Sequence, residues 1–398
     1  MKILFVSYSD GGGGAAKAIF NLYKSFRNVS KNKLLVIDKR EKNKKITLYQ
    51  SGFIGKVFRR LRYLIAQFIF LNQTFYVMSL NLIDSGLSKY INNSPYEIVN
   101  LHWVNCETIS LSEIKKINKS IVWTLHDMWP ISGIYHYDLD KKYFNNESTS
   151  ELKKKYFNFL DKITKKRKKN LFNQKKIHLI SPSKWLLEKA KKTKLPFGEM
   201  EVIPNPINIS FYKKSKDINS LKKKYKIPNN KKILLYSSLK LDEKRKGFNI
   251  IKNIIKNQKF DNHIFIFFGI NNSLNKINFT KNIIFINGTN NEKSIREIYS
   301  IADVLLFPSL IDNFPNTLLE AMSCNLPCVA FNCYGMKEII THKKNGYLVK
   351  PYSTEDFRKG IEYVLLNKKK FSSIRKEVVK NYSYKKIKNS YNRFFDRI

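Results

Sequence analysis

Short apolar runs alternate with helix-periodic segments along the first half of the chain. The first run, Ile3–Ser7, is followed by a segment from Ala15 to Phe26 in which apolar residues recur at helical spacing. Such runs, bounded by polar clusters, predict strands at Ile3–Ser7, Leu34–Ile37, Ile98–Leu101, Ile121–Leu125 and Ile177–Ile180. Continuous apolar strands separated by helices are typical of a parallel sheet covered on both faces.

The second half repeats this plan after the prolines at 204 and 206 interrupt it. Strands are predicted at Ile233–Tyr236, His263–Phe268, Ile283–Ile286, Val304–Phe307 and Cys328–Phe331, and Lys213–Asn230 reads as a polar connector or surface helix. The pattern predicts an α/β protein with two doubly wound, Rossmann-like domains facing across a cleft. The expected domains are 1–205 and 206–375, with 376–398 as a C-terminal helix for which packing back on the first domain is one arrangement.

Composition adds a strong charge bias to this picture. Seventy-four Lys and Arg against 31 Asp and Glu give a net charge of +43, which favours anionic partners such as nucleic acid, an acidic membrane face or phosphorylated small molecules. Four cysteines in 398 residues exclude a disulfide scaffold. The apolar start is too short for a signal peptide, so the expected location is cytoplasmic.

One segment has two interpretations that involve the membrane. No charge occurs between Arg62 and Asp84, but the polar residues there favour a helix that does not span a bilayer. The wider segment Phe53–Leu82 begins with basic residues among helix-spaced apolar ones. It could attach the protein peripherally to an anionic leaflet, or it could pack as core against the first domain's sheet.

Two loops at strand ends of the first half carry candidate chemistry. Gly11–Gly14 follow the first strand and open the first helix, where backbone amides can approach a phosphate or a sugar. The glycines match neither a dinucleotide fingerprint nor a P-loop. His126 and Asp127 follow another strand; this histidine is either a general acid or base, a hydrogen-bond donor to substrate, or a structural cap.

The second half contributes a cationic loop and a carboxylate-bearing loop. Lys240–Gly247 clusters cations after the first strand of this half, which suits a diphosphate but is also typical of a solvated charge run. Pro308–Met322 follows Val304–Phe307 and holds two carboxylates, Asp312 and Glu320, separated by seven residues. A helix that begins near position 316 would direct its amino terminus towards the same region.

These segments together resemble a retaining glycosyltransferase of family four with the GT-B fold. The family's Glu-x7-Glu motif appears as Asp312-x7-Glu320, and its Arg-x5-Lys-Gly pair appears as Lys240 with Lys246-Gly247. The glycine loop, the His126-Asp127 strand end, Ser181-Pro182-Ser183 and Ile203-Pro204-Asn205-Pro206 also fall where the family has them. The stretch Thr124–Pro130 resembles the capsule and exopolysaccharide branch.

The resemblance implies transfer of a sugar from a nucleotide-diphosphate sugar to a glycan or lipid-linked acceptor, with retention of configuration and without a metal or other cofactor. It implies catalytic roles for His126, Asp312 and Lys246. The implied donor-binding residues are Lys240, Lys246, Asp312, Asn313, Phe314, Pro315, Asn316, Thr317 and Glu320. The implied acceptor or phosphate loop consists of Gly13, Gly14 and Asp127.

The chain departs from the family pattern at three positions. Asp312 is one methylene shorter than the family's glutamate, Lys240 lacks the planar fork of arginine, and Asn325 stands where glycine is usual. Asp138-Leu139-Asp140 is a weak candidate for a divalent metal, and Cys324, Cys328 and Cys333 are not spaced like zinc ligands.

Two rival functions remain open. A basic nucleic-acid-binding protein would explain the charge, although the lysines are spread along the chain instead of forming one aromatic-lined stripe. A sugar-nucleotide epimerase can use the same two-domain fold.

Overall fold

The structure is a computed structural model that describes residues 1–26, 31–43, 45–49, 53–71, 78–146, 149–241, 243–256, 260, 262–270, 282–287 and 292–398. The chain divides into two compact units, residues 1–204 with 388–398 and residues 205–387. The second unit therefore extends to Ile387, beyond the position 375 expected from the sequence. The expected single helix over 376–398 is interrupted at Ser383 between two helices.

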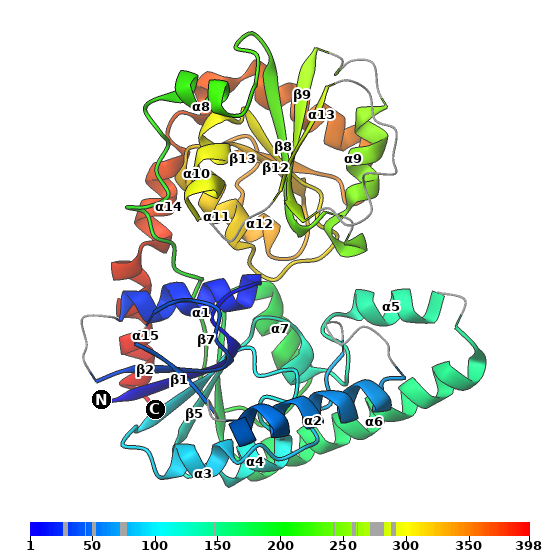
Figure 1. Ribbon diagram of the computed structural model, residues 1–398, viewed down its shortest axis with the longest axis vertical. Helices are drawn as coiled ribbons and strands as arrows, with labels where there is room; N and C mark the ends of the chain where they lie inside the picture. Colours follow the sequence, from blue (N-terminus) through cyan, green and yellow to red (C-terminus); the bar gives the residue numbers. More distant parts are fainter. Residues whose placement is uncertain are drawn as a thin grey trace. The chain divides into compact units, whose positions relative to one another are not determined.

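The first unit is built on a seven-stranded sheet whose described pairings are parallel, in the order β3-β2-β1-β4-β5-β6-β7 (Figure 1). Its strands are β1 (Ile3–Ser9), β2 (Lys33–Asp38), β3 (Ile46–Leu48), β4 (Ile98–Leu101), β5 (Ser120–Thr124), β6 (Ile177–Ser181) and β7 (Met200–Val202). Strands β1, β4, β5 and β6 are almost entirely buried, as a sheet covered on both faces requires. The order reverses between β1 and β4, where doubly wound sheets place their ligands.

Helices connect and flank these strands. They are α1 (Gly14–Ser25), α2 (Phe53–Ile69), α3 (Leu87–Asn92), α4 (Leu111–Lys116), the 3-10 helix η2 (Trp129–Ile131), α5 (Asp138–Asn146), α6 (Glu151–Gln174), α7 (Lys184–Lys192) and most of α15 (Tyr384–Phe395). Asp138 and Asp140 lie in the first turn of α5, where carboxylates interact favourably with the helix dipole.

The second unit repeats the strand order of the first. Its six strands are parallel and have the order β10-β9-β8-β11-β12-β13. The strand order, not the strand direction, reverses between β8 and β11. The strands are β8 (Lys232–Lys240), β9 (His263–Ile270), β10 (Ile283–Asn287), β11 (Val304–Phe307), β12 (Cys328–Phe331) and β13 (Gly346–Val349). The other elements are α8 (Ile218–Lys224), the 3-10 helix η3 (Lys244–Lys246), α9 (Phe248–Ile255), α10 (Glu292–Ile301), α11 (Asn316–Ser323), α12 (Met336–Ile339), α13 (Thr354–Leu366), the 3-10 helix η6 (Lys368–Phe371) and α14 (Ile374–Tyr382).

Helix α2 is shorter than the helix that the sequence predicts for this segment. The predicted helix to Leu82 ends at Ile69; Leu71 has a positive φ of 49°, and residues 78–84 form irregular chain. Positions 72–77 lie outside the described residues. Only Arg62 and Ala66 of α2 are buried, while Phe53 is 82% and Phe68 81% exposed. Most apolar side chains of this helix are therefore exposed in the described part of the chain, whereas Ala66 and Ile69 pack in a small core cluster.

Within the described residues, no helix is long and apolar enough to cross a membrane.

Candidate functional site

The loop between β11 and α11 is fixed by backbone bonds from two other loops of the second unit. Leu310 N donates to the carbonyl oxygen of Arg245 over 2.8 Å, and Arg245 Nη1 donates to the carbonyl oxygen of Ile311 over 3.0 Å. On the other side, Gly335 N donates to Asp312 O over 3.1 Å. A Cβ at Gly335 would lie 1.5 Å from the carbonyl oxygen of Asn313, so only glycine allows this contact.

An ion pair joins the two chemistry-bearing loops of this unit. Lys246 Nζ donates to Asp312 Oδ2 over 2.7 Å, and Arg245 Nη1 lies 3.9 Å from the same oxygen. The lysine side chain is 21% exposed and the aspartate 16%, so both groups reach solvent. The structure thus places two of the three predicted catalytic residues in direct contact.

Gly247 permits the close approach of these loops. It has a φ of +73°, and a Cβ there would lie 1.9 Å from the carbonyl oxygen of Pro308. A side chain at this position would push the Lys246 loop away from the start of the β11–α11 loop. In the Lys246-Gly247 pair, the lysine supplies the cation, and the glycine allows the lysine's loop to approach Pro308 closely.

The predicted donor-binding run between Asn313 and Thr317 lies at the amino terminus of α11. Asn313, Phe314 and Asn316 are buried, with 3%, 5% and 8% exposure. Asn205 Nδ2 donates to Phe314 O over 3.1 Å and to Asn316 Oδ1 over 3.2 Å. Pro315 is the N-cap residue, and its side chain makes no capping bond. Thr317 is half-buried in the first turn.

Glu320 occupies a different environment, on the second turn of α11. It is 3% exposed, and its Oε2 accepts a hydrogen bond from the Tyr299 hydroxyl over 3.3 Å. Burial, together with the nearby Glu320 charge, raises the pKa of Tyr299 well above its usual value, so the phenol stays a donor. Glu320 is therefore a buried carboxylate held by a phenol, apart from the Lys246–Asp312 pair.

Lys240 is exposed at the end of β8, outside the Lys246–Asp312 ion pair. Asp242, in the same loop, lies outside the described residues. Lys240 is therefore exposed at the strand end, whereas Lys246 is 21% exposed and contacts Asp312.

In the first unit, the loop Gly11–Gly14 packs against Arg40. Asp10 Oδ1 accepts from Arg40 N over 2.8 Å, and a Cβ at Gly12 would overlap the Arg40 guanidinium. At Gly13 and Gly14, by contrast, an added Cβ would meet no atom of the described residues within 4 Å. The first turn of α1 therefore lies at the carboxyl end of β1, where a ligand-binding loop is expected.

His126 lies at the same edge of the sheet, after β5. Its Nε2 is 2.9 Å from Nδ1 of His102, which follows β4. Burial lowers the pKa of His126 to about 4 against the opposing charge of Asp127, and burial and His126 lower the pKa of His102 well below its usual value. Both imidazoles are therefore neutral at pH 7.

Asp127, predicted in the acceptor loop, serves as a structural hub. It is 6% exposed; its Oδ2 accepts from Trp103 Nε1 over 2.8 Å, and its Oδ1 accepts from Trp129 N over 2.9 Å. His136 Nδ1 lies 3.3 Å from Oδ2. With these contacts made, Asp127 orders the loop beside His126.

The weak metal candidate separates into two unrelated side chains. Asp138 Oδ2 lies 3.6 Å from Lys189 Nζ, while Asp140 Oδ2 accepts from Tyr137 N over 2.9 Å. Among the described residues, no cluster of three or more His, Cys, Asp or Glu could hold a metal ion. Burial raises the pKa of Cys324 and Cys333 to about 12, so these thiols stay protonated.

Several site residues were absent from the sequence prediction. Gly335 and Tyr299 support the second-unit loops through contacts that no spacing rule encodes, and Arg245 and Asn205 do the same from segments that the sequence singled out without giving these two residues a role. His102 could have been found, because it directly follows the predicted strand Ile98–Leu101, as His126 follows its own strand. Asn325, which stands where the family has glycine, has the positive φ of 61° that glycine favours and asparagine tolerates.

Comparison with known proteins finds similarity in the second unit. Residues 217–385 match the family model "Glycosyl transferases group 1". An uncharacterized glycosyltransferase of Haemophilus influenzae is 36% identical over 70 residues, covering 17% of this chain and 20% of that protein. N-acetyl-alpha-D-glucosaminyl L-malate synthase of Bacillus anthracis is 27% identical over 160 residues, covering 38% of this chain and 41% of that protein. The chain thus aligns with only a fifth to two fifths of the length of these relatives.

Solved structures match the fold over the full chain. HepE of Anabaena, in complex with UDP-glucose, has a TM-score of 0.71 at 16% identity, with 100% of each chain covered. Sucrose-phosphate synthase of Thermosynechococcus elongatus has a TM-score of 0.71 at 13% identity, with 100% of this chain and 99% of that one covered. The predicted fold of two Rossmann-like units of the GT-B type is confirmed.

Proposed function

We propose that this protein is a glycosyltransferase that moves a sugar from a nucleotide-diphosphate sugar to a glycan or lipid-linked acceptor. The Lys246–Asp312 pair carries the proposal, because it joins the cationic loop to the β11–α11 loop within the segment that matches the group 1 family. The pair follows β8 and β11, between which the strand order reverses.

The chemistry requires a group that stabilises the leaving diphosphate. As the glycosidic bond breaks, negative charge grows on the phosphate oxygen, and the Lys246 ammonium and the amino terminus of α11 can both stabilise it. Asp312 would accept hydrogen bonds from sugar hydroxyls, and Glu320 from the ribose. In this proposal the protein's own cation does the work of a metal, and transfer retains the anomeric configuration.

The acceptor belongs to the first unit in this proposal. An added Cβ at Gly13 or Gly14 would meet no atom of the described residues within 4 Å, so an acceptor or phosphate could approach the loop there, and His126 lies at the same sheet edge. The cellular role that we propose is synthesis of a cell-surface polysaccharide, such as a capsule, at the cytoplasmic face of the membrane.

The deciding experiment offers a panel of UDP- and GDP-sugars with a lipid-linked acceptor extract and measures nucleotide release and labelled product. We expect acceptor-dependent product that persists in EDTA. Loss of activity in EDTA with rescue by manganese would contradict the metal-free mechanism. Sugar isomers formed without transfer would indicate an epimerase, and oligonucleotide binding tighter than nucleotide-sugar binding would indicate a nucleic-acid-binding protein.

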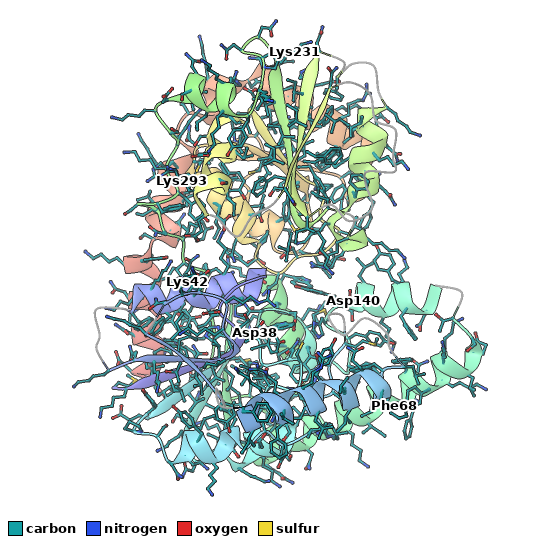
Figure 2. All side chains as sticks on the ribbon, in the orientation of Figure 1. Asp38, Lys42, Phe68, Asp140, Lys231 and Lys293 are labelled. Carbon is teal, nitrogen blue, oxygen red and sulfur yellow. The ribbon has the colours of Figure 1, made fainter. Side chains whose placement is uncertain are left out.

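Peripheral attachment to an anionic membrane is the second part of the proposal. Exposed apolar side chains run along α2, and Phe68 projects from it in Figure 2. Helix α6 lies beside α2 in Figure 1. Tyr156 Oη of α6 donates a hydrogen bond to Ile69 O over 2.9 Å, and the ring of Phe157 stacks on that of Phe70. Helix α6 also carries the exposed apolar side chains of Leu152 and Phe159 between lysines. Apolar side chains ringed by cations suit an anionic leaflet.

The membrane prediction concerns the exposed cations of α2. Arg62 is buried and Arg59 Nη1 donates to Ile37 O, whereas Lys56 and Arg60 are exposed. Changing Lys56 and Arg60 to Gln should weaken binding to phosphatidylglycerol vesicles about 30-fold, at about 1 kcal/mol per charge. Co-sedimentation at low salt measures this.

The matched control makes the same charge change in the second unit, with Lys213 and Lys223, both exposed, changed to Gln. It should bind vesicles like the wild type, and neutral vesicles should bind neither protein strongly. Equal losses in both variants would show that net charge, and not α2, causes the attraction. Failure of the wild type to bind anionic vesicles would end the proposal.

A further inference from the structure

The buried histidine His102 makes an asymmetric contact with His126. Its backbone is fixed from two neighbouring strands: His102 N donates to Val6 O over 2.9 Å, and Trp123 Nε1 donates to His102 O over 3.2 Å. The ring is 2% exposed. Its Nδ1 faces Nε2 of His126, while its own Nε2 is buried and without a hydrogen-bond partner in the described part of the chain.

Only two neutral arrangements satisfy the 2.9 Å contact between the two rings. Either His102 donates from Nδ1, leaving its buried Nε2 as an unused lone pair, or His126 donates from Nε2, leaving a buried N–H on His102 Nε2. Orphaned buried N–H groups are rarer in proteins than under-used acceptors. The first arrangement is therefore favoured.

This arrangement fixes the chemistry of His126. With Nε2 as acceptor, a neutral His126 carries its proton on Nδ1. His126 is half-buried, and its Nδ1 has no hydrogen-bond partner among the described residues. Burial keeps the pKa of His126 low, with Asp127 as the opposing charge, so the imidazolium is not formed near neutral pH.

We propose that His102 is a positioning residue that donates from Nδ1 to His126 Nε2 and holds His126 as an Nδ1–H donor to an oxygen of the sugar substrate. His126 then acts by hydrogen bonding, not as a general acid or base. The substrate part rests on the proposed function; the tautomer does not.

The first test reads the tautomer directly. NMR of the full chain labelled with 15N-histidine, with the His126 signal assigned by its loss in His126→Asn, reports which ring nitrogen bears the proton. At pH 7 we expect His126 protonated at Nδ1 and His102 also at Nδ1. A proton on His126 Nε2, an equal mixture, or an imidazolium would overturn the proposal.

Two substitutions of His102 separate positioning from packing. In His102→Asn the amide nitrogen can replace Nδ1 as donor, whereas His102→Phe keeps an aromatic ring without one. We expect the Phe variant to lose the single His126 tautomer and about tenfold in kcat/KM, the loss of one hydrogen bond, and the Asn variant to retain both. Equal kinetics and spectra in the two folded variants would contradict the positioning role.

The NMR result also keeps the two proposals apart. If no nucleotide sugar is turned over while His126 is an Nδ1–H tautomer, the proposed function fails and the His102 inference stands. If nucleotide sugar is turned over normally while His126 is protonated at Nε2, the proposed function stands and the His102 inference fails.

Discussion

Replacing Glu320 with glutamine should lower kcat/KM for the nucleotide sugar about 30- to 150-fold. The carboxylate is 3% exposed, so in our proposal it meets a donor hydroxyl with little competing water. A hydrogen bond to a charged group in such a place contributes about 2–3 kcal/mol. Glutamine keeps the volume and an oxygen that can accept from the Tyr299 hydroxyl, so the fold should persist.

The control is another buried glutamate of the same unit. Glu297, 5% exposed, also accepts from a tyrosine hydroxyl, that of Tyr225, but it lies on α10 and pairs with Lys224. Glu297→Gln should leave kcat/KM nearly unchanged. A Glu320→Gln protein that is folded by circular dichroism and turns over at the wild-type rate would remove Glu320 from the site.

The central strands of both sheets could be predicted from the sequence because burial on both faces makes them continuous apolar runs. All ten predicted strands are present. The three missed strands, Ile46–Leu48, Met200–Val202 and Gly346–Val349, are short, and each has half-buried positions. Such edge-type segments have neither the length nor the unbroken apolar character that the prediction needs.

The end of α2 could not be predicted for a different reason. The uncharged stretch after Arg62 continues a helix-compatible pattern, but Ser79 and Asn81 are buried in irregular chain. Asn81 Nδ2 donates to the carbonyl oxygens of Val104 and Ile109 over 2.6 and 2.7 Å. Hydrogen bonds between loops that are distant in the sequence override the local periodicity, and they cannot be predicted from the segment itself.

In the candidate site, the roles predicted for the motif residues stay predictions, and the structure shows only which of these residues lie together. The Lys246 and Asp312 motifs converge in the structure, as the family pattern implies. The sequence could not show that the Asp127 carboxylate accepts hydrogen bonds from Trp103 and Trp129, because hydrogen bonds between loops depend on tertiary placement. The same limit hid the His102 contact, which arises because β4 and β5 are neighbours.

Removing the Lys246 ammonium should cause the other large loss of activity. We expect Lys246→Ala to lower kcat about 10²- to 10³-fold, as loss of one preorganised donor to a developing oxyanion does. Arg245 Nη1, 3.9 Å from Asp312, is too far to replace the 2.7 Å contact. Single-turnover kinetics with a saturating nucleotide sugar would measure the loss in the chemical step.

Stability cannot account for such a loss. The Lys246–Asp312 pair is 21% and 16% exposed, and a pair in contact with solvent contributes about 1 kcal/mol or less to folding. The melting temperature of Lys246→Ala should therefore stay close to that of the wild type. Lys240→Ala, which removes an exposed lysine of the same loop region, is the matched control and should lose much less activity. If both variants lose activity equally, the loop acts as a diffuse positive field; if Lys246→Ala retains wild-type kcat, the diphosphate does not lie against Lys246.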